Sequence, residues 1–264
     1  MGCRHMAEIT FGSLFAGIGG FDLGFERAGM SCKWQVEIDD YANKVLANHW
    51  PDVHRERDIR ECGKHNLELV DVICGGFPCQ DISLAGDGAG INGTRSGLWH
   101  EYARIICELE PRVVVVENVA ALLIRGFDRV LGTLANLGYD AEWSCVSACS
   151  MGAPHSRDRM FIVAHRREVR WNRGGWDING KDGVCSRLNN WEAAKGGTKW
   201  GDVERWIKSI VEDGGGIIPP SERSGMANGI PNRLDRVGGC GNAVVPQVAE
   251  FIGRKLLLCM GENT

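Results

Sequence analysis

The stretch ITFGSLFAGIGGFDLGFERAG, residues 9–29, decides the fold. Ile9 to Phe15 form an apolar run typical of a buried strand, Ala16 to Gly20 form a glycine-rich turn, and the apolar spacing that follows predicts a helix ending near Gly29. Glycines let such a turn bend tightly and let a ligand approach the helix N-terminus. Taken alone, the turn is equally well explained as a plain strand-to-helix connection, because its third glycine comes too early for the G-x-G-x-x-G dinucleotide fingerprint.

Strand and helix patterns alternate from this stretch as far as residue 165. The valine run 113–116 is typical of a strand buried on both faces. Repeated strand-then-helix units predict an α/β fold: a doubly wound, Rossmann-like parallel sheet with helices on both faces. The further strands expected are Trp34–Ile38, Val70–Cys74, Val113–Val116 and Asp158–Ala164, and the further helices are Tyr41–Trp50, Leu98–Leu109, Phe127–Leu137 and Val245–Met260.

The composition changes after His165. Residues 166–236 are rich in glycine, hold five of the nine tryptophans and carry more basic than acidic residues, although the whole chain has a net charge of -4. Only Val203–Val211 has a clear helical pattern there. We therefore expect a first domain formed by residues 1–165 and 237–264, and a small, irregular second domain over 166–236.

Composition also excludes several classes of protein. The 264 residues contain no apolar run of the ~18 to 20 residues that a membrane helix needs, and no apolar N-terminal signal. The eleven cysteines form no C-x-x-C pair, so free thiols in a reducing compartment are expected. These features exclude a secreted disulfide scaffold and predict a cytoplasmic protein with no membrane or metal partner.

Three side chains are expected at the carboxyl edge of the sheet. Glu37 lies about 20 residues beyond the glycine turn, where such folds hold a ribose hydroxyl, although it could be a solvated loop acid. Cys79, in GGFPCQ, follows a buried strand, where a thiolate nucleophile would be displayed, although a buried cysteine is often only a small hydrophobe. Glu117 directly follows the valine run, where burial raises the pKa of a carboxyl and lets it donate a proton near neutral pH. Its alternative role is an N-cap acid.

Two later motifs add polar side chains. Arg157 and Arg159, in PHSRDR, point the same way on an extended chain and can offer planar donor forks to carbonyls, carboxylates or phosphates. Surface ion pairs at a polar strand end would also explain them. Asn242, in GNAVVP, begins the last expected helix, where capping alone would account for it.

In this order, these motifs resemble the DNA (cytosine-5)-methyltransferase family. The resemblance covers about residues 9–165 and 231–257, and its most specific part is Pro-Cys-Gln followed by Glu-Asn-Val. It implies an S-adenosylmethionine-dependent methyltransferase fold and a site-specific DNA methyltransferase of prokaryotic or phage type, as found in restriction-modification. The expected partner is double-stranded DNA, the second domain would recognise the target sequence, and a monomer in the bacterial or phage-infected cytoplasm is expected.

The resemblance also implies a mechanism. The Cys79 thiolate adds to C6 of a cytosine flipped out of the duplex, Glu117 engages N3, and Arg159 and Arg157 orient the base and the acid. The methyl group passes from S-adenosyl-L-methionine to C5, which leaves S-adenosyl-L-homocysteine. The remaining site residues implied are Ser83 and Arg95 toward DNA, and Phe15, Gly17, Gly19, Glu37, Ile38, Asp58, Ile59, Pro78, Asn242 and Val244 toward the cofactor.

Three departures from the family pattern and three rival functions remain. The segment between the arginine pair and the last motif, which recognises the target sequence in the family, is short, at roughly 65 to 80 residues. His155 stands where the family usually has glutamine, and Arg57 precedes Asp58 where glycine is common. A tRNA cytosine-5 methyltransferase of the same architecture ranks below, because the variable region lacks a Cys-Phe-Thr tripeptide. A protein that flips cytosine without methylating it is disfavoured by the intact Cys79 and Glu117. A nicotinamide dehydrogenase leaves the Pro-Cys-Gln unexplained.

Overall fold

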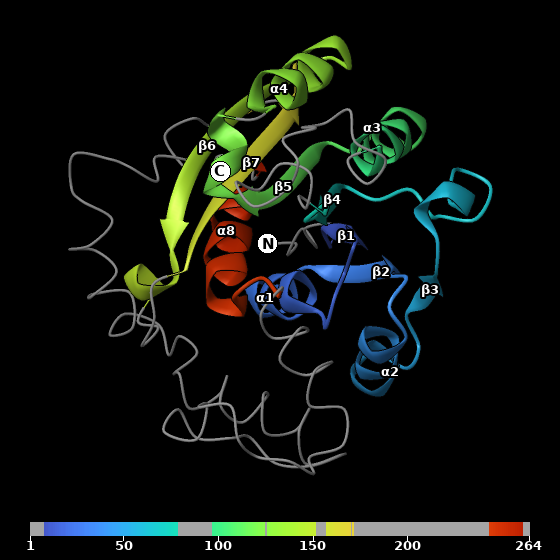
Figure 1. Cartoon of the computed structure of the whole chain (residues 1–264). Helices are drawn as coiled ribbons and strands as arrows, with labels where there is room; N and C mark the ends of the chain where they lie inside the picture. The colour runs from blue at the N-terminus through green and yellow to red at the C-terminus, as the bar shows by residue number, and fades with distance from the viewer. Residues whose placement is uncertain are drawn as a thin grey trace, which may run out of the picture.

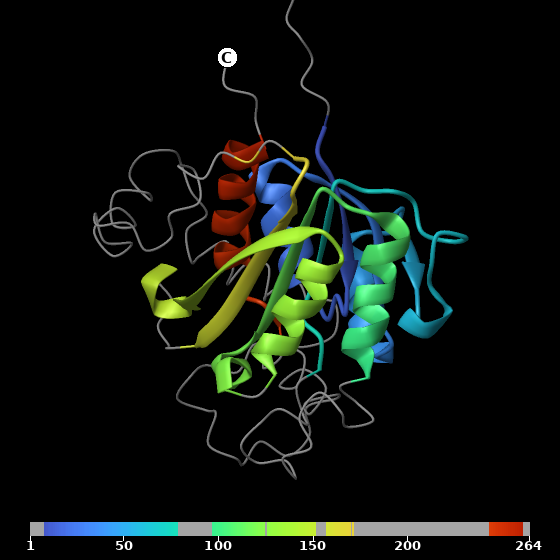
Figure 2. The same ribbon diagram turned by 90° about the horizontal axis from the view of Figure 1, so that it is seen from above.

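The computed structural model describes residues 8–78, 97–124, 126–151, 157–169, 171 and 243–260. Helices flank a seven-stranded sheet on both sides (Figures 1 and 2). The strands are β1 (Thr10–Leu14), β2 (Ser31–Val36), β3 (His54–Glu56), β4 (Val72–Gly75), β5 (Val113–Val119), β6 (Tyr139–Ser147) and β7 (Asp158–Arg166). The helices are α1 (Gly20–Ala28), α2 (Asp40–His49), α3 (Leu98–Leu109), α4 (Phe127–Asn136) and α8 (Pro246–Met260), with 3-10 turns η1 (Ile59–Glu61), η3 (Ala120–Ile124) and η4 (Ala148–Met151).

The strand order places the candidate site. The sheet runs β3-β2-β1-β4-β5-β7-β6, and its first five strands are parallel. The order reverses direction between β1 and β4, because the chain moves outward from β1 to β3 and then returns to the other side. Ligands bind open sheets at such a switch point, beyond the carboxyl ends of the strands. The α/β, doubly wound arrangement expected from the sequence is confirmed.

The two last strands correct the expectation of a wholly parallel sheet. β7 pairs with β5 in antiparallel fashion, and β6 pairs with β7 in the same way. The physical reason is the connection: only ten residues separate β6 from β7, of which the structure describes the short turn η4 and Arg157, and an antiparallel neighbour needs no crossover helix. β3 and β6 are additional strands that the sequence patterns did not predict.

Each face of the sheet has its own core. α3, α4 and the neighbouring loops cover one face, where the largest buried side chains are Trp34, Trp99 and Tyr102. α1 and α8 cover the other face, where Phe11 and Phe25 are fully buried. Figure 2 shows the sheet between these two pairs of helices. The central strands are therefore covered by apolar side chains on both faces.

Three glycines bring α1 and α8 unusually close. A side chain at Gly20 would come 2.2 Å from the carbonyl oxygen of Val244, and one at Gly24 would come 2.4 Å from Cβ of Ala249. A side chain at Gly253 would likewise meet Ala28 at 2.8 Å. The close approach fixes Val244, from the far end of the chain, against the turn that follows β1.

The predicted domain boundary falls at the end of β7. β7 continues to Arg166, and the ring of Trp171 stacks on His165 with centroids 4.5 Å apart while packing on the core beneath α1 and α8. The helix predicted at Val203–Val211 lies outside the described residues. Among the described helices, none has the length and apolar character needed to span a bilayer.

Candidate active site

β5 carries an acid to the carboxyl edge of the sheet. The strand extends to Val119, so Glu117 lies inside it, opposite Phe161 of β7, and is not a helix N-cap. Its side chain leans over the end of β4, because a Cβ at Gly76 would come 2.5 Å from Glu117 Oε2. Gly76 therefore leaves the space that the carboxyl group occupies.

The electrostatics of Glu117 are set by burial and by arginine. The residue is only 7% exposed, and its Oε1 lies 3.0 Å from Nε of Arg159. Burial raises the pKa of the carboxyl to about 7, although the positive charges of Arg159 and Arg157 pull it down. The pKa of Arg157 is itself lowered, chiefly by burial and then by the charge of Arg159. The carboxyl can thus hold or release a proton near neutral pH.

Asn118 anchors the segment that leads to the predicted nucleophile. Its buried Nδ2 donates to the carbonyl of Phe77 at 3.2 Å, and its Oδ1 accepts from the backbone N–H of Val119. Pro78 comes next and is the last described residue before Cys79. Of the predicted site, Cys79, Ser83, Arg95 and Asn242 lie outside the described residues.

A row of four aromatic rings, two of them from α3, runs from the segment after β4 to the turn after β1. The rings of Phe77, Trp99, Tyr102 and Phe15 follow one another with centroids 5.3, 5.6 and 6.3 Å apart. Tyr102 is fully buried and donates its hydroxyl to the carbonyl of Val115. The row packs against Phe77, which precedes the predicted nucleophile, and against Phe15, which follows β1. Sequence analysis missed Trp99, Tyr102 and Asn118, whose partners lie in other elements.

The turn after β1 faces the acid at the end of β2. The backbone N–H of Gly17 donates to Oε2 of Glu37 at 2.7 Å, and the N–H of Asp39 donates to Oε1 at 2.8 Å. Phe15, Gly17 and Gly19 all have positive φ, and a side chain at Gly17 would meet no atom within 4 Å. The turn is thus open beside a fixed carboxylate.

The adenine end of the predicted cofactor site lies on two neighbouring loops. Ile38, directly after Glu37, is 60% exposed, while Ile59 is buried. Asp58 accepts from the backbone N–H and the guanidinium of Arg60, which holds the pKa of this carboxyl below its usual value. An exposed apolar side chain and the carboxyl groups of two neighbouring loops suit an adenosine, which offers a flat ring, an amino group and two hydroxyls. The residues present therefore fit the adenosine part of S-adenosylmethionine.

The described residues contain no group of three or more His, Cys, Asp or Glu side chains able to hold a metal ion. The polar groups at this edge are instead a titratable acid, two arginines, backbone N–H groups and two carboxylates. Such a set can bind a nucleoside and exchange a proton with an aromatic ring nitrogen.

Comparisons with known proteins show which family the chain resembles. The model of the family described as C-5 cytosine-specific DNA methylase matches residues 9–213. The chain is 31% identical to the type II methyltransferase M.HhaI of Haemophilus parahaemolyticus over 63% of this chain and 52% of that protein. It is 39% identical to the type II methyltransferase M.Eco47II of Escherichia coli, over 59% of this chain and 39% of that protein.

A solved structure resembles nearly the whole chain. The Entamoeba histolytica methyltransferase EhMeth matches with a TM-score of 0.65 over 97% of this chain and all of that chain, at 16% identity. At this identity the likeness concerns the fold alone. The chain spans about half the length, or less, of the curated relatives described above.

Proposed function

The chain belongs to the C-5 cytosine-specific DNA methylase family, and from this premise we propose that it transfers a methyl group from S-adenosylmethionine to C5 of cytosine at specific sites in double-stranded DNA. The observation that carries the proposal is the Glu117 carboxyl, buried above Gly76 with a pKa of about 7 and paired with Arg159. A carboxyl in this state can protonate or hydrogen-bond N3 of cytosine at neutral pH.

The proposed reaction proceeds through a covalent adduct. The Cys79 thiolate forms a bond to C6 while Glu117 supplies a proton to N3, and this makes C5 nucleophilic. The cofactor, when bound, supplies a methyl group activated by its sulfonium. C5 takes this methyl, the C5 proton leaves to a base, and the electrons of the C5–H bond expel Cys79 from C6. The covalent bond to Cys79 is thereby broken, and N3 returns its proton to Glu117, which restores both the neutral base and the acid.

Other residues would hold the reactants in place. Arg159 fixes the carboxyl of Glu117 at 3.0 Å, and Asn118 fixes the backbone before Pro78 and Cys79. The cytosine must leave the duplex to reach this buried edge, so base flipping is part of the proposal. Ser83 and Arg95 would contact the DNA, and the domain over residues 166–236 would read the target sequence.

The cofactor would lie along the turn after β1. Glu37, already hydrogen-bonded to the N–H of Gly17, would accept from the ribose hydroxyls. Ile38 would cover the adenine, Asp58 would accept from its amino group, and Ile59 would pack behind it. Phe15, Gly19, Pro78, Asn242 and Val244 would complete the walls of this site.

The test combines activity, location and a matched thiol control. The full chain is incubated with unmethylated duplex DNA and tritiated S-adenosylmethionine, and bisulfite sequencing locates the product. Cys79→Ser is expected to abolish methyl transfer, yet to bind S-adenosylhomocysteine as the wild type does. Cys107→Ser, which removes an exposed thiol of α3, should keep full activity.

A covalent trap adds a second readout. DNA containing 5-fluorocytosine should leave an adduct on the wild type that survives denaturation, because the fluorine at C5 cannot depart as a proton does. Undiminished turnover by Cys79→Ser would refute the nucleophile. Methylation of tRNA but not of duplex DNA would favour the tRNA-modifying alternative.

A further inference from the structure

In the loop between β2 and α2, the backbone carbonyls of residues 37–39 accept hydrogen bonds from two side chains. Asn43 Nδ2 donates to the carbonyls of Glu37 at 2.6 Å and of Asp39 at 2.8 Å. The carbonyl between them, that of Ile38, accepts instead from Arg57 Nη2 at 2.6 Å. Asn43 belongs to the helix that follows the loop. Arg57 comes from a different part of the chain, directly after β3.

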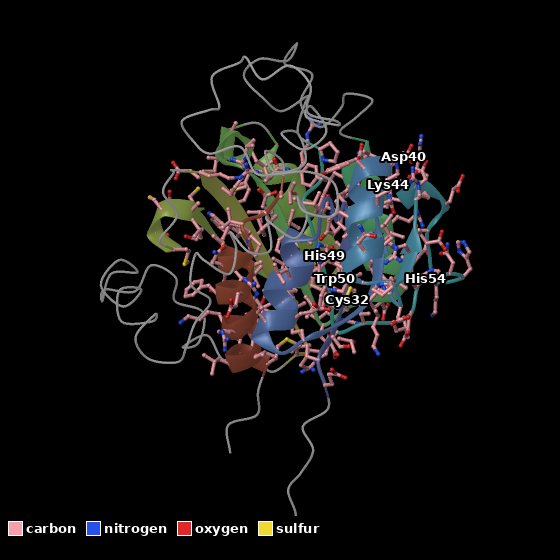
Figure 3. All side chains as sticks on the ribbon, turned by 90° about the horizontal axis from the view of Figure 1, so that it is seen from below. Cys32, Asp40, Lys44, His49, Trp50 and His54 are labelled. Atoms are coloured by element: carbon pink, nitrogen blue, oxygen red, sulfur yellow. The ribbon has the colours of Figure 1, made fainter. Side chains whose placement is uncertain are left out.

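Arg57 bridges two loops at the point where their strands separate. The last backbone bond between the strands runs from the N–H of Glu37 to the carbonyl of Glu56 at 3.1 Å. Beyond it, one chain continues to Ile38 and the other to Asp58. The guanidinium of Arg57 spans this gap, and it also lies 2.5 Å from Oδ1 of Asp40. Asp40 begins α2, at the opposite end of that helix from His49 and Trp50 (Figure 3).

We propose that Arg57 is a positioning residue that sets the spacing between Ile38 and Asp58 and so pre-organises the adenosine end of the cofactor site. The inference rests on the proposed function, since it assigns these two residues to adenosine. Rigidifying a loop in its bound conformation raises affinity by lowering the entropy lost on binding. A glycine at this position could form neither of the two bonds.

The contribution of Arg57 to binding can be estimated from the solvent exposure of its contacts. The side chain of Arg57 is 50% exposed and that of Asp40 is 84% exposed, so their ion pair contributes little by itself. The bond to the Ile38 carbonyl is also exposed, but it joins the two loops directly, so we assign the positioning to it. We expect the loss of Arg57 to weaken binding by about three- to tenfold, and to leave the folding of the chain almost unchanged.

The experiment measures binding to the full-length chain by titration calorimetry. The two ligands are S-adenosylhomocysteine and 5′-methylthioadenosine, which shares the adenosine but lacks the amino-acid end. The variants are Arg57→Ala and Arg57→Lys. Arg112→Ala is the matched control, because it breaks a half-exposed pair with Asp71 at the opposite end of the sheet. Hydrogen exchange of the ligand-free protein then reports on the amides of residues 38–41.

Arg57→Ala should weaken both ligands by the same factor, Arg57→Lys should recover part of the loss, and Arg112→Ala should match the wild type. Exchange at residues 38–41 should be faster in Arg57→Ala. Wild-type affinity of Arg57→Ala for both ligands, or a loss confined to S-adenosylhomocysteine, would overturn the inference alone. A wild type that binds neither ligand would overturn the proposed function, and the role of Arg57 with it.

Discussion

Two opposing effects nearly balance at the carboxyl of Glu117. Burial disfavours the charged form, and the guanidinium groups of Arg159 and Arg157 favour it. The resulting pKa of about 7 leaves both forms populated at neutral pH. A group that must give a proton to a ring nitrogen and later take it back needs this balance, because a fully charged or fully neutral acid would perform only half of the cycle.

The titration of Glu117 predicts a pH dependence of the methylation rate. Glu117→Gln keeps the shape of the side chain but cannot give up a proton, so we expect its rate to fall at least about tenfold at pH 6.5. The ratio of wild-type to variant rate should then decline as the pH rises above 7, because the wild-type carboxyl loses the proton it donates. Rates measured from pH 5.5 to 9 check this. Taking the ratio removes the ionisation of Cys79, which both proteins share.

The affinity of both proteins for S-adenosylhomocysteine provides the control, since Glu117 is not placed in the cofactor site. A ratio that stays constant from pH 6 to 9 would contradict proton donation by Glu117. It would leave the carboxyl as a hydrogen-bond acceptor only.

The sequence predicted those site residues that lie in, or directly after, a strand recognisable from its own apolar pattern. Glu37 directly follows β2 and Glu117 lies two residues before the end of β5, so the structure has both near the carboxyl edge. Asn118 and Arg57 were not assigned roles, because each acts on a backbone carbonyl far away in sequence. The bond from Asn118 to Phe77 spans 41 residues and that from Arg57 to Ile38 spans 19. No local pattern carries such a pairing.

At the scale of elements, burial explains which strands could be predicted. β4 and β5 are apolar through most of their length because helices cover both of their faces. β3, with the sequence HRE, and β6, which contains three buried residues among nine, lie at the two edges of the sheet. An edge strand covered on fewer sides has a weaker apolar pattern, and both were missed for this reason.

The contact between α1 and α8 gives the next prediction. Gly24→Ala should lower the free energy of unfolding by about 1 to 3 kcal/mol, because its new methyl group would lie 2.4 Å from Cβ of Ala249 and 2.6 Å from the carbonyl oxygen of Pro246. The displaced α8 should also carry Val244 away from Gly20 and weaken S-adenosylhomocysteine binding. Denaturant unfolding and calorimetry measure the two effects.

Gly132→Ala is the matched control, since Gly132 lies inside α4 and a side chain there would meet no atom within 4 Å. This substitution should stabilise the protein by about 0.5 to 1 kcal/mol, because alanine loses less backbone entropy in a helix than glycine does. Equal effects of the two substitutions would show that α1 and α8 do not pack as closely as the structure has them.

At the scale of the whole molecule, segments that are far apart in the sequence meet at the proposed cofactor site. The turn after β1 and the residues before α8 are more than 220 positions apart in the sequence, yet Gly20 and Val244 are in contact. The doubly wound sheet was predictable because its units are local. The antiparallel addition of β7 and β6 was not, because it departs from the strand-helix-strand unit on which the prediction was based.

The pKa of the buried Asp22 carboxyl depends on how tightly α1 packs against the sheet. It lies in α1 but is sealed against β1 and β2, where it accepts from Ser13 Oγ at 3.2 Å and from Gln35 Nε2 at 2.9 Å. Burial raises the pKa of its carboxyl to about 6, from 3.8 in the unfolded chain, although these hydrogen bonds oppose the shift. Between these two values the folded protein binds more protons than the unfolded one, so its stability falls as the pH rises.

Asp22→Asn removes this titration and predicts a pH-dependent gain. The difference in unfolding free energy between variant and wild type should rise by up to about 3 kcal/mol from pH 4 to pH 7, which is the shift expressed as free energy. The change with pH is the quantity to measure, because the amide also alters the bonds to Ser13 and Gln35 at every pH. Asp52→Asn, at an exposed position, controls for the loss of one negative charge. If the difference in unfolding free energy stays constant from pH 4 to pH 7, water reaches Asp22. In that case α1 does not exclude water from the sheet next to the turn after β1.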